Sequence, residues 1–264
     1  MIISPDLFLI LSVAGVAAVA SPTGGLLALS AKPTTLFLSL ALGFAGGVLL
    51  ATISFEMLPQ ALELSSMPVA VAGFLIGFAF VYGFDLFIHR GKLAGPKAEQ
   101  EREVELYHVQ HQPRGDQVTV LAGGTSIEEL IEGLSIGVGA AIKPGLGLLI
   151  ALAIVIDNLA EALSIGELIR DQQRHEKRRP VWRVLKWTGL IGISLLSSAL
   201  AGWFLFRGLP RPVLGYLFAA GGGGMFYLTM SDLVPEAEQR HYQQSAALAI
   251  GAGFMTIFVL GHFF

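Results

Sequence analysis

Cysteine is absent from the 264 residues of this chain, and charged residues make up only 14% of it. The first absence excludes disulfides, thiolate zinc sites and cysteine nucleophiles. The second sets the chain apart from soluble domains, which carry about 25% charged residues, and 53% of this chain is hydrophobic. The net charge of -3 provides no basic surface, so we expect no nucleic-acid partner. The composition instead predicts a protein whose main solvent is lipid.

Long apolar runs support that prediction. A hydrocarbon core of about 30 Å needs roughly 20 helical residues, and this criterion predicts eight membrane spans. We therefore expect an all-α, polytopic membrane protein with internal repeats, in which residues 1–264 form a single transmembrane domain. The predicted spans are 6–30, 34–63, 67–90, 122–142, 145–169, 185–206, 212–236 and 241–263.

One long polar segment interrupts the spans at residues 91–121, and it is predicted to be a mobile cytoplasmic loop. His108 and His111 lie in this segment and are candidates for loose metal binding, although histidines in polar loops are usually only solvated.

Basic residues are distributed unequally between the two sides of the predicted membrane. Fourteen of the 17 lysines and arginines fall in the loops on one side, and the other side keeps only Lys143, Arg207 and Arg211. Cytoplasmic loops carry the excess of lysine and arginine in membrane proteins. The pattern predicts that both termini lie outside the cytoplasm, and the expected location is the plasma membrane.

The acidic residues, in contrast, remain inside the predicted spans. The span at 122–142 alone contains Glu128, Glu129 and Glu132. A carboxylate at the centre of a membrane helix costs about 2.5–3.5 kcal/mol, so three facing lipid would cost on the order of 9 kcal/mol. Acids in such a place are protonated, line a water-filled cavity or bind a cation. Cation binding explains best why there are so many.

A repeated sequence favours the same explanation. Residues 132–137 and 161–166 match at five of six positions, and both carry an acid, an acid or amide, and a glutamate at positions i, i+1 and i+4. These positions lie within about 100° of one another on a helix. If the two helices face each other, their oxygen atoms form a site for one or two cations. The candidate metal ligands are Glu128, Glu129, Glu132, Asp157, Asn158 and Glu161. The alternative is a hydrogen-bonded packing network between the helices.

A second repeat joins the second and seventh predicted spans. Residues 56–61 align with 232–237, and each segment has an acid, a proline three residues later and a Gln or Glu at i+4. Proline in a membrane helix frees a backbone carbonyl that can coordinate a cation. Interrupted helices at matching places in two halves of a chain are typical of secondary transporters.

We predict a transport pathway from these residues together with the two serines of the first repeat. The pathway candidates are Glu56, Gln60, Asp232, Glu236, Ser135 and Ser164. Solvation at the membrane interface is the alternative for Glu56, Asp232 and Glu236, and bonding to carbonyls of their own helices is the alternative for the serines.

With these motifs the chain resembles the ZIP family of divalent-metal transporters. The fourth-span motif reads Glu128-Glu129-Leu130-Ile131-Glu132-Gly133 and the fifth-span motif Asp157-Asn158-Leu159-Ala160-Glu161-Ala162. The resemblance implies eight spans, outward-facing termini and metal ligands on the fourth and fifth spans. It covers nearly the whole chain.

The chain also departs from the family pattern. The motif histidines are replaced by Glu128 and Asp157, and Ser197 lies near the position where many bacterial members carry a further glutamate. All the remaining candidate ligands are oxygen atoms, which favour harder ions such as Mn²⁺ over zinc.

The expected function is transport of divalent metal toward the cytoplasm, with zinc, iron or manganese as the substrate. The expected partners are these ions and the lipid bilayer, and a homodimer is left open. A proton-coupled exporter or exchanger and a metal sensor without flux are the alternatives. We expect no enzyme activity, because a metal hydrolase usually needs histidine ligands and the chain has no His-Glu-x-x-His motif.

Overall fold

The structure is a computed structural model that describes residues 5–88, 117–173, 180–239 and 242–262, and every regular element in these ranges is a helix. The elements are α1 (Pro5–Ala31), α2 (Thr35–Ala51), η1 (Thr52–Met57), α3 (Leu58–Leu64), α4 (Met67–Ile88), α6 (Gln117–Ile142), α7 (Pro144–Gln173), α8 (Pro180–Phe206), α9 (Arg211–Leu228), η2 (Thr229–Leu233), α10 (Val234–Gln239) and α11 (Gln243–Gly261). The short π-helical segments η1 and η2 join α2 to α3 and α9 to α10 without a break.

The prediction of an all-α polytopic membrane protein is confirmed. Seven helical stretches in the described residues are long and apolar enough to cross a membrane. The eighth, α6, has 26 residues and the length to do so. Its three glutamates lie near its middle and lower its overall apolar character.

The predicted spans agree with the observed helices except at some ends. Helix α6 begins at Gln117, inside the segment predicted to be a loop, because Val118 and Ala122 are buried and extend its packed face. Helix α7 also continues past the predicted end of the fifth span, to Gln173, and α8 begins before the predicted start of the sixth, at Pro180. His108 and His111 lie outside the described residues.

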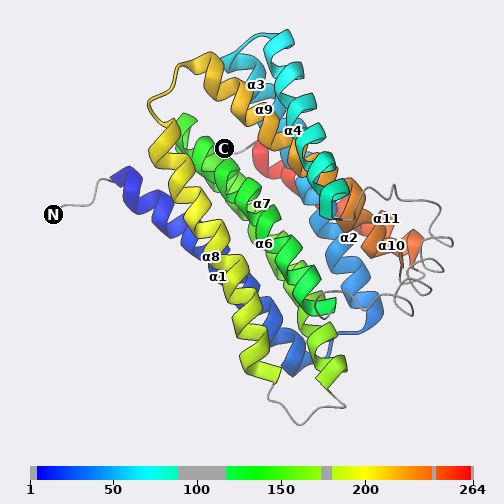
Figure 1. The fold of residues 1–264 in the computed structure, drawn as a ribbon. Helices are drawn as coiled ribbons and strands as arrows, with labels where there is room; N and C mark the ends of the chain where they lie inside the picture. The colour runs from blue at the N-terminus through cyan, green and yellow to red at the C-terminus, as the bar shows by residue number, and fades with distance from the viewer. Residues whose placement is uncertain (1–4, 89–116, 174–179, 240–241, 263–264) are drawn as a thin grey trace.

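The helices form two groups that meet at α6 and α7. Helices α1, α6, α7 and α8 form the group that we call the α6–α7 bundle, and α2–α3, α4, α9–α10 and α11 form the α2–α9 bundle. The main contacts between them join α2 to α7 and α6 to α9. Figure 1 shows α6 and α7 in green between α1 with α8 on one side and the α2–α9 bundle on the other.

Glycines at the ends of the first repeat allow close packing of the α6–α7 bundle. A Cβ at Gly137 of α6 would collide with the carbonyl of Ala199 on α8, and one at Gly166 of α7 would lie 2.6 Å from the carbonyl oxygen of Gly25 on α1. Small residues allow membrane helices to approach in this way. Each copy of the repeat therefore fixes its own helix against an outer helix.

The second repeat is larger than its motif. Helices α2 and α9 begin 176 residues apart, at Thr35 and Arg211, and α4 and α11 begin the same distance apart, at Met67 and Gln243. Both π-helical segments precede a proline. The backbone N–H groups of Leu58 and Val234 bond to carbonyls five residues earlier, as in a π-helix. This wider turn accommodates the following proline, which has no backbone N–H to donate.

The two halves are inverted relative to each other. Successive spans run in opposite directions, so the second and third spans run opposite to the seventh and eighth, which match them in sequence position. We call the end of the molecule with the α1–α2 connector and the start of α8 the long-loop face. The short-turn face carries the connectors at 65–66, 143 and 207–210.

Candidate metal site

The two triads predicted as metal ligands face each other across the α6–α7 contact. The Asn158 Nδ2 group donates a hydrogen bond to Glu129 Oε2 over 3.3 Å. The carboxyl groups of Glu132 and Asp157 also contact each other. Glu129, Asp157 and Asn158 are each only 1% exposed. Glu128 and Glu161 are half-buried beside them. The six side chains therefore lie together at the contact between the two helices.

The site contains buried oxygen atoms that have no hydrogen-bond partner. Six buried side-chain polar atoms among the described residues lack one, and four of them belong to this site. They are Glu129 Oε1, Glu132 Oε2, Asp157 Oδ1 and Asn158 Oδ1. An unmet buried polar atom costs about 1–3 kcal/mol, so such groups are normally bonded. A cation between the helices would satisfy them.

The electrostatic surroundings are negative. The strongest charge neighbours of each acid in the site are other carboxylates; for Glu161 they are Asp157, Glu128, Glu132 and Glu129. In the described part of the chain, however, no three His, Asp or Glu side chains are close enough together to hold a metal ion. Binding would therefore require side-chain rotation toward a common centre.

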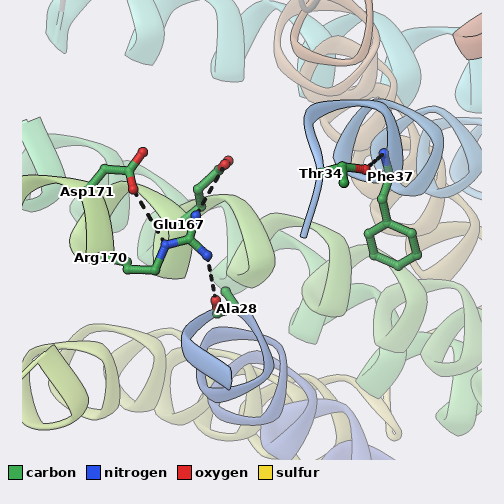
Figure 2. A network of polar contacts seen from close by, with 6 residues as sticks. All are labelled: Ala28, Thr34, Phe37, Glu167, Arg170 and Asp171. Carbon is green, nitrogen blue, oxygen red and sulfur yellow. Dashed lines mark hydrogen bonds and ion pairs between the residues drawn. The ribbon is translucent and has the colours of Figure 1, made fainter. Parts of the chain in front are cut away.

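Acids elsewhere in the spans do have cationic neighbours. Arg170 Nη2 lies 3.6 Å from Glu167 Oε1 near the end of α7, and Arg170 also donates to the carbonyl oxygen of Ala28 on α1 over 3.1 Å. Figure 2 shows this network with Asp171, and also shows Thr34, whose hydroxyl caps α2 by accepting from the Phe37 N–H. Glu167 therefore has a cationic partner on its own helix, because α7 extends past Arg170.

The pathway candidates lie toward the two faces of the membrane. Glu56 of η1 is half-buried, has Lys143 as its electrostatic neighbour and packs against Gly261. Gln60 Nε2 bonds to Glu63 Oε2 over 3.1 Å. On the long-loop side Asp232 is exposed, and its Oδ2 accepts from Ser231 over 3.1 Å.

The two serines of the first repeat behave differently. Ser135 Oγ donates to the Ile131 carbonyl oxygen of its own helix over 2.9 Å, as the alternative reading of the sequence predicted. Ser164 Oγ donates to Glu236 Oε1 over 2.8 Å and so connects α7 to α10.

A cavity of about 260 Å³ lies beside Glu128, between α4, α6, α9 and η2. Asp85 and Asp232 also line it, and apolar side chains make up most of the remaining wall. The Tyr227 hydroxyl donates to Asp85 Oδ2 over 2.5 Å. No sequence pattern connects Asp85 with the site, because Asp85 lies alone near the end of its span.

The sixth span contacts the site helix α6 through Ser198, the residue next to Ser197. Ser197 is exposed and bonds to the Ser194 carbonyl of its own helix. The next residue, Ser198, is buried and donates to the Glu129 carbonyl oxygen over 3.1 Å. The spacing of Leu195, Ser198 and Gly202 along one helix face could have indicated this.

Comparison with known proteins agrees with this architecture. A sequence profile of the ZIP Zinc transporter family matches residues 89–260, which is more than half of the chain. The chain belongs to the ZIP zinc transporter family. Relatives named zinc transporter ZupT, from Salmonella paratyphi A, Salmonella newport and Salmonella heidelberg, are each 29% identical over 218 residues, covering 80% of this chain and 79% of theirs.

The facing triads of this ZIP protein contain only oxygen donors and the amide of Asn158, and no histidine. The motif positions that the resemblance associates with histidine carry Glu128 and Asp157, so the described site has five carboxylates and one amide. Carboxylate and amide oxygens suit hard divalent cations, and carboxylates also bind zinc.

Proposed function

We propose that the protein transports divalent metal cations across the membrane through the site between α6 and α7. The observation that carries this proposal is the group of four buried oxygen atoms without hydrogen-bond partners among the described residues, on facing helices. A packing network would leave few such atoms, because each costs free energy. Membership of a family of zinc transporters supports the same function.

Each side chain has a proposed role. Glu132 and Glu161 bridge the ion or pass it between positions, since each lies between the other two members of its triad. Glu128, Glu129, Asp157 and Asn158 complete the coordination shell. Glu56, Gln60, Asp232 and Glu236 form the two ends of the pathway, with Ser135 and Ser164 beside them.

The proposed substrates include zinc, iron and manganese. The names of the relatives support zinc. The oxygen-only donor set favours harder ions, of which Mn²⁺ is the best match in the group. We propose a broad selectivity in which Mn²⁺ competes with Zn²⁺.

The proposed direction is toward the cytoplasm, with the long-loop face on the cytoplasmic side. The excess of lysine and arginine in the loops of that face supports this orientation. This orientation places both termini outside the cytoplasm. The proposed location of the protein is the plasma membrane. Alternating access by movement of one bundle against the other is the mechanism typical of inverted repeats.

The test is metal flux in proteoliposomes. We expect Zn²⁺ and Mn²⁺ to enter vesicles with the unchanged protein, and Glu132→Ala combined with Glu161→Ala to abolish flux. Asp171→Asn is the matched control, because Asp171 is an exposed acid at the far end of α7 and should leave flux unchanged.

The outcomes separate the alternatives. Full flux in the doubly substituted protein would refute the proposed site. Flux that follows an imposed pH gradient would indicate an exchanger, and metal binding in detergent without any flux would indicate a sensor. Zinc transport that excess Mn²⁺ does not inhibit would contradict the argument from ligand hardness.

A further inference from the structure

Close glycine contacts within the α2–α9 bundle recur in both inverted halves. A Cβ at Gly47 of α2 would collide with the carbonyl of Ile250, and a Cβ at Gly223 of α9 would collide with the carbonyl of Phe74. Gly47 and Gly223 lie 176 residues apart in the sequence, and so do Phe74 and Ile250. This bundle therefore has nearly the same geometry at the two faces of the membrane.

The short helices α3 and α10 are also held in equivalent positions. Ser39 Oγ of α2 donates to the Ala237 carbonyl oxygen of α10 over 2.6 Å. At the equivalent place a Cβ on Gly215 of α9 would lie 2.9 Å from the carbonyl oxygen of Ala61 on α3. The two short helices are therefore held against α2 and α9 in the same way in both halves.

The contacts between the bundles do differ. Ser164 of α7 bonds to Glu236 of α10 at the long-loop side, over 2.8 Å. The equivalent residues at the short-turn side are Ser135 of α6 and Gln60 of α3. Ser135 bonds instead to the Ile131 carbonyl and Gln60 to Glu63, so the equivalent bond is absent among the described residues.

The cavity is asymmetric as well. It lies at the long-loop side, between Glu128, Asp232 and Asp85. The residues equivalent to the last two are Glu56 and Gly261, and there Glu56 Oε1 lies so close to Gly261 that a Cβ would collide with it. Helix α7 also contacts η1 directly at that side. The space that is hollow at one face is therefore filled at the other.

We infer that the Ser164–Glu236 bond and its inverted counterpart, Ser135–Gln60, are two latches that form alternately as the α6–α7 bundle moves. The inference rests on the proposed transport function. In the other state Ser135 bonds to Gln60, the Ser164–Glu236 bond is broken, and the cavity lies beside Asp157 and Glu56. The ion reaches the site past Glu128 in one state and past Asp157 in the other.

Inverted repeats explain why the two latches can alternate. Two halves of similar sequence can exchange conformations at little cost, because each state uses the same kinds of contact at opposite faces. A serine hydroxyl can donate to a glutamate carboxylate or to the carbonyl oxygen of a glutamine side chain. Both latches are therefore chemically able to form, and a single movement of α6 and α7 breaks one as it makes the other.

The absence of native cysteine allows a direct test by crosslinking. The first variant carries Ser164→Cys and Glu236→Cys, and the second carries Gln60→Cys and Ser135→Cys. Each is treated in detergent with a short bifunctional thiol reagent, in EDTA or in Zn²⁺. Ser39→Cys with Ala237→Cys is the control, because it spans a contact within one bundle.

In EDTA we expect the first pair to crosslink about tenfold faster than the second, and Zn²⁺ to reduce that ratio. The control pair should crosslink equally in both conditions. Adding Ser164→Ala to the second pair should accelerate its crosslinking in EDTA, which tests the latch without changing Glu236. In liposomes, crosslinking either pair should stop zinc flux, reduction should restore it, and the crosslinked control should transport normally.

Equal crosslinking with and without metal, or full flux through either crosslinked latch, would overturn the inference even in a protein that transports zinc. Absence of flux from the unchanged protein would instead refute the transport proposal. Because the crosslinking ratio is measured in detergent and needs no flux, the two failures are distinguishable.

Discussion

The substitution Glu129→Gln should have opposite effects on the metal-free and metal-bound protein. Glu129 is 1% exposed, its Oε2 accepts from Asn158, and its Oε1 has no partner among the described residues. A glutamine keeps the acceptor and adds an amide group that can donate toward Asn158 Oδ1, which is also without a partner. It also removes a charge from a group of carboxylates.

The size of the effect follows from these contacts. Relief of an unmet buried polar atom contributes about 1–3 kcal/mol, so metal-free stability should rise by that amount. For a chain of this size each kcal/mol raises the melting temperature by about 2–4 °C. In the unchanged protein, metal at 100 times its Kd stabilises by about 2.7 kcal/mol. A tenfold weaker site loses about 1.4 kcal/mol of that.

Thermal unfolding in detergent, in EDTA and in a Zn²⁺ series, measures both quantities in one experiment. The control is Asp171→Asn, an exposed acid that should change neither the melting temperature in EDTA nor the response to metal. If Glu129→Gln lowers the melting temperature in EDTA and keeps the full zinc response, Glu129 belongs to a packing network and is not a ligand.

Four further predictions concern packing and chemistry. Gly77→Ala should lower the free energy of unfolding in detergent by about 1–3 kcal/mol, because a Cβ there collides with the Ala220 carbonyl. Gly83→Ala on the same helix should raise it by about 1 kcal/mol, because a Cβ there meets no atom within 4 Å. Arg170→Gln should lower stability by about 1 kcal/mol through loss of its bond to Ala28; no change would show that α1 is held without it. Zinc flux should fall as the medium is acidified from pH 7 to pH 5, with KM rising, because protons and metal compete for the carboxylates; a pH-independent KM would contradict this. Glu128→His with Asp157→His should shift competition between Zn²⁺ and Mn²⁺ toward zinc by about tenfold or more, and an unchanged ratio would place both residues outside the coordination shell.

The parts that the sequence predicted are those set by periodicity and by the cost of charge in lipid. Eight apolar runs predicted the spans to within a few residues, and the i, i+1, i+4 spacing predicted that the polar side chains of each triad share one face of their helix. Both predictions depend on quantities that act within one helix: its length, its rise per residue and the angle between successive side chains.

The parts that it did not predict depend on how different helices are placed against one another. Ser197 and Ser198 differ by about 100° around α8. The spacing of Ser198 with Leu195 and Gly202 marks a helix face, and the packed structure shows that this face meets α6. Asp85 approaches the site only because α4 packs on α9, where Tyr227 donates to it. The different bonding of Ser135 and Ser164 has no counterpart in their nearly identical motifs, because it reflects the relative position of two bundles.

The different bonding of Ser135 and Ser164 offers a reason why neither motif position carries a histidine. Glu128 and Asp157 are equivalent under the first repeat, and both stand where the family resemblance places histidine. In the two-latch scheme Glu128 faces the cavity in one state and Asp157 faces it in the other. A histidine kept at only one of them would bind a borderline metal more tightly from that side, so release there would be slower. With a carboxylate at both positions, each side presents the same class of ligand, and an ion that enters past one can leave past the other.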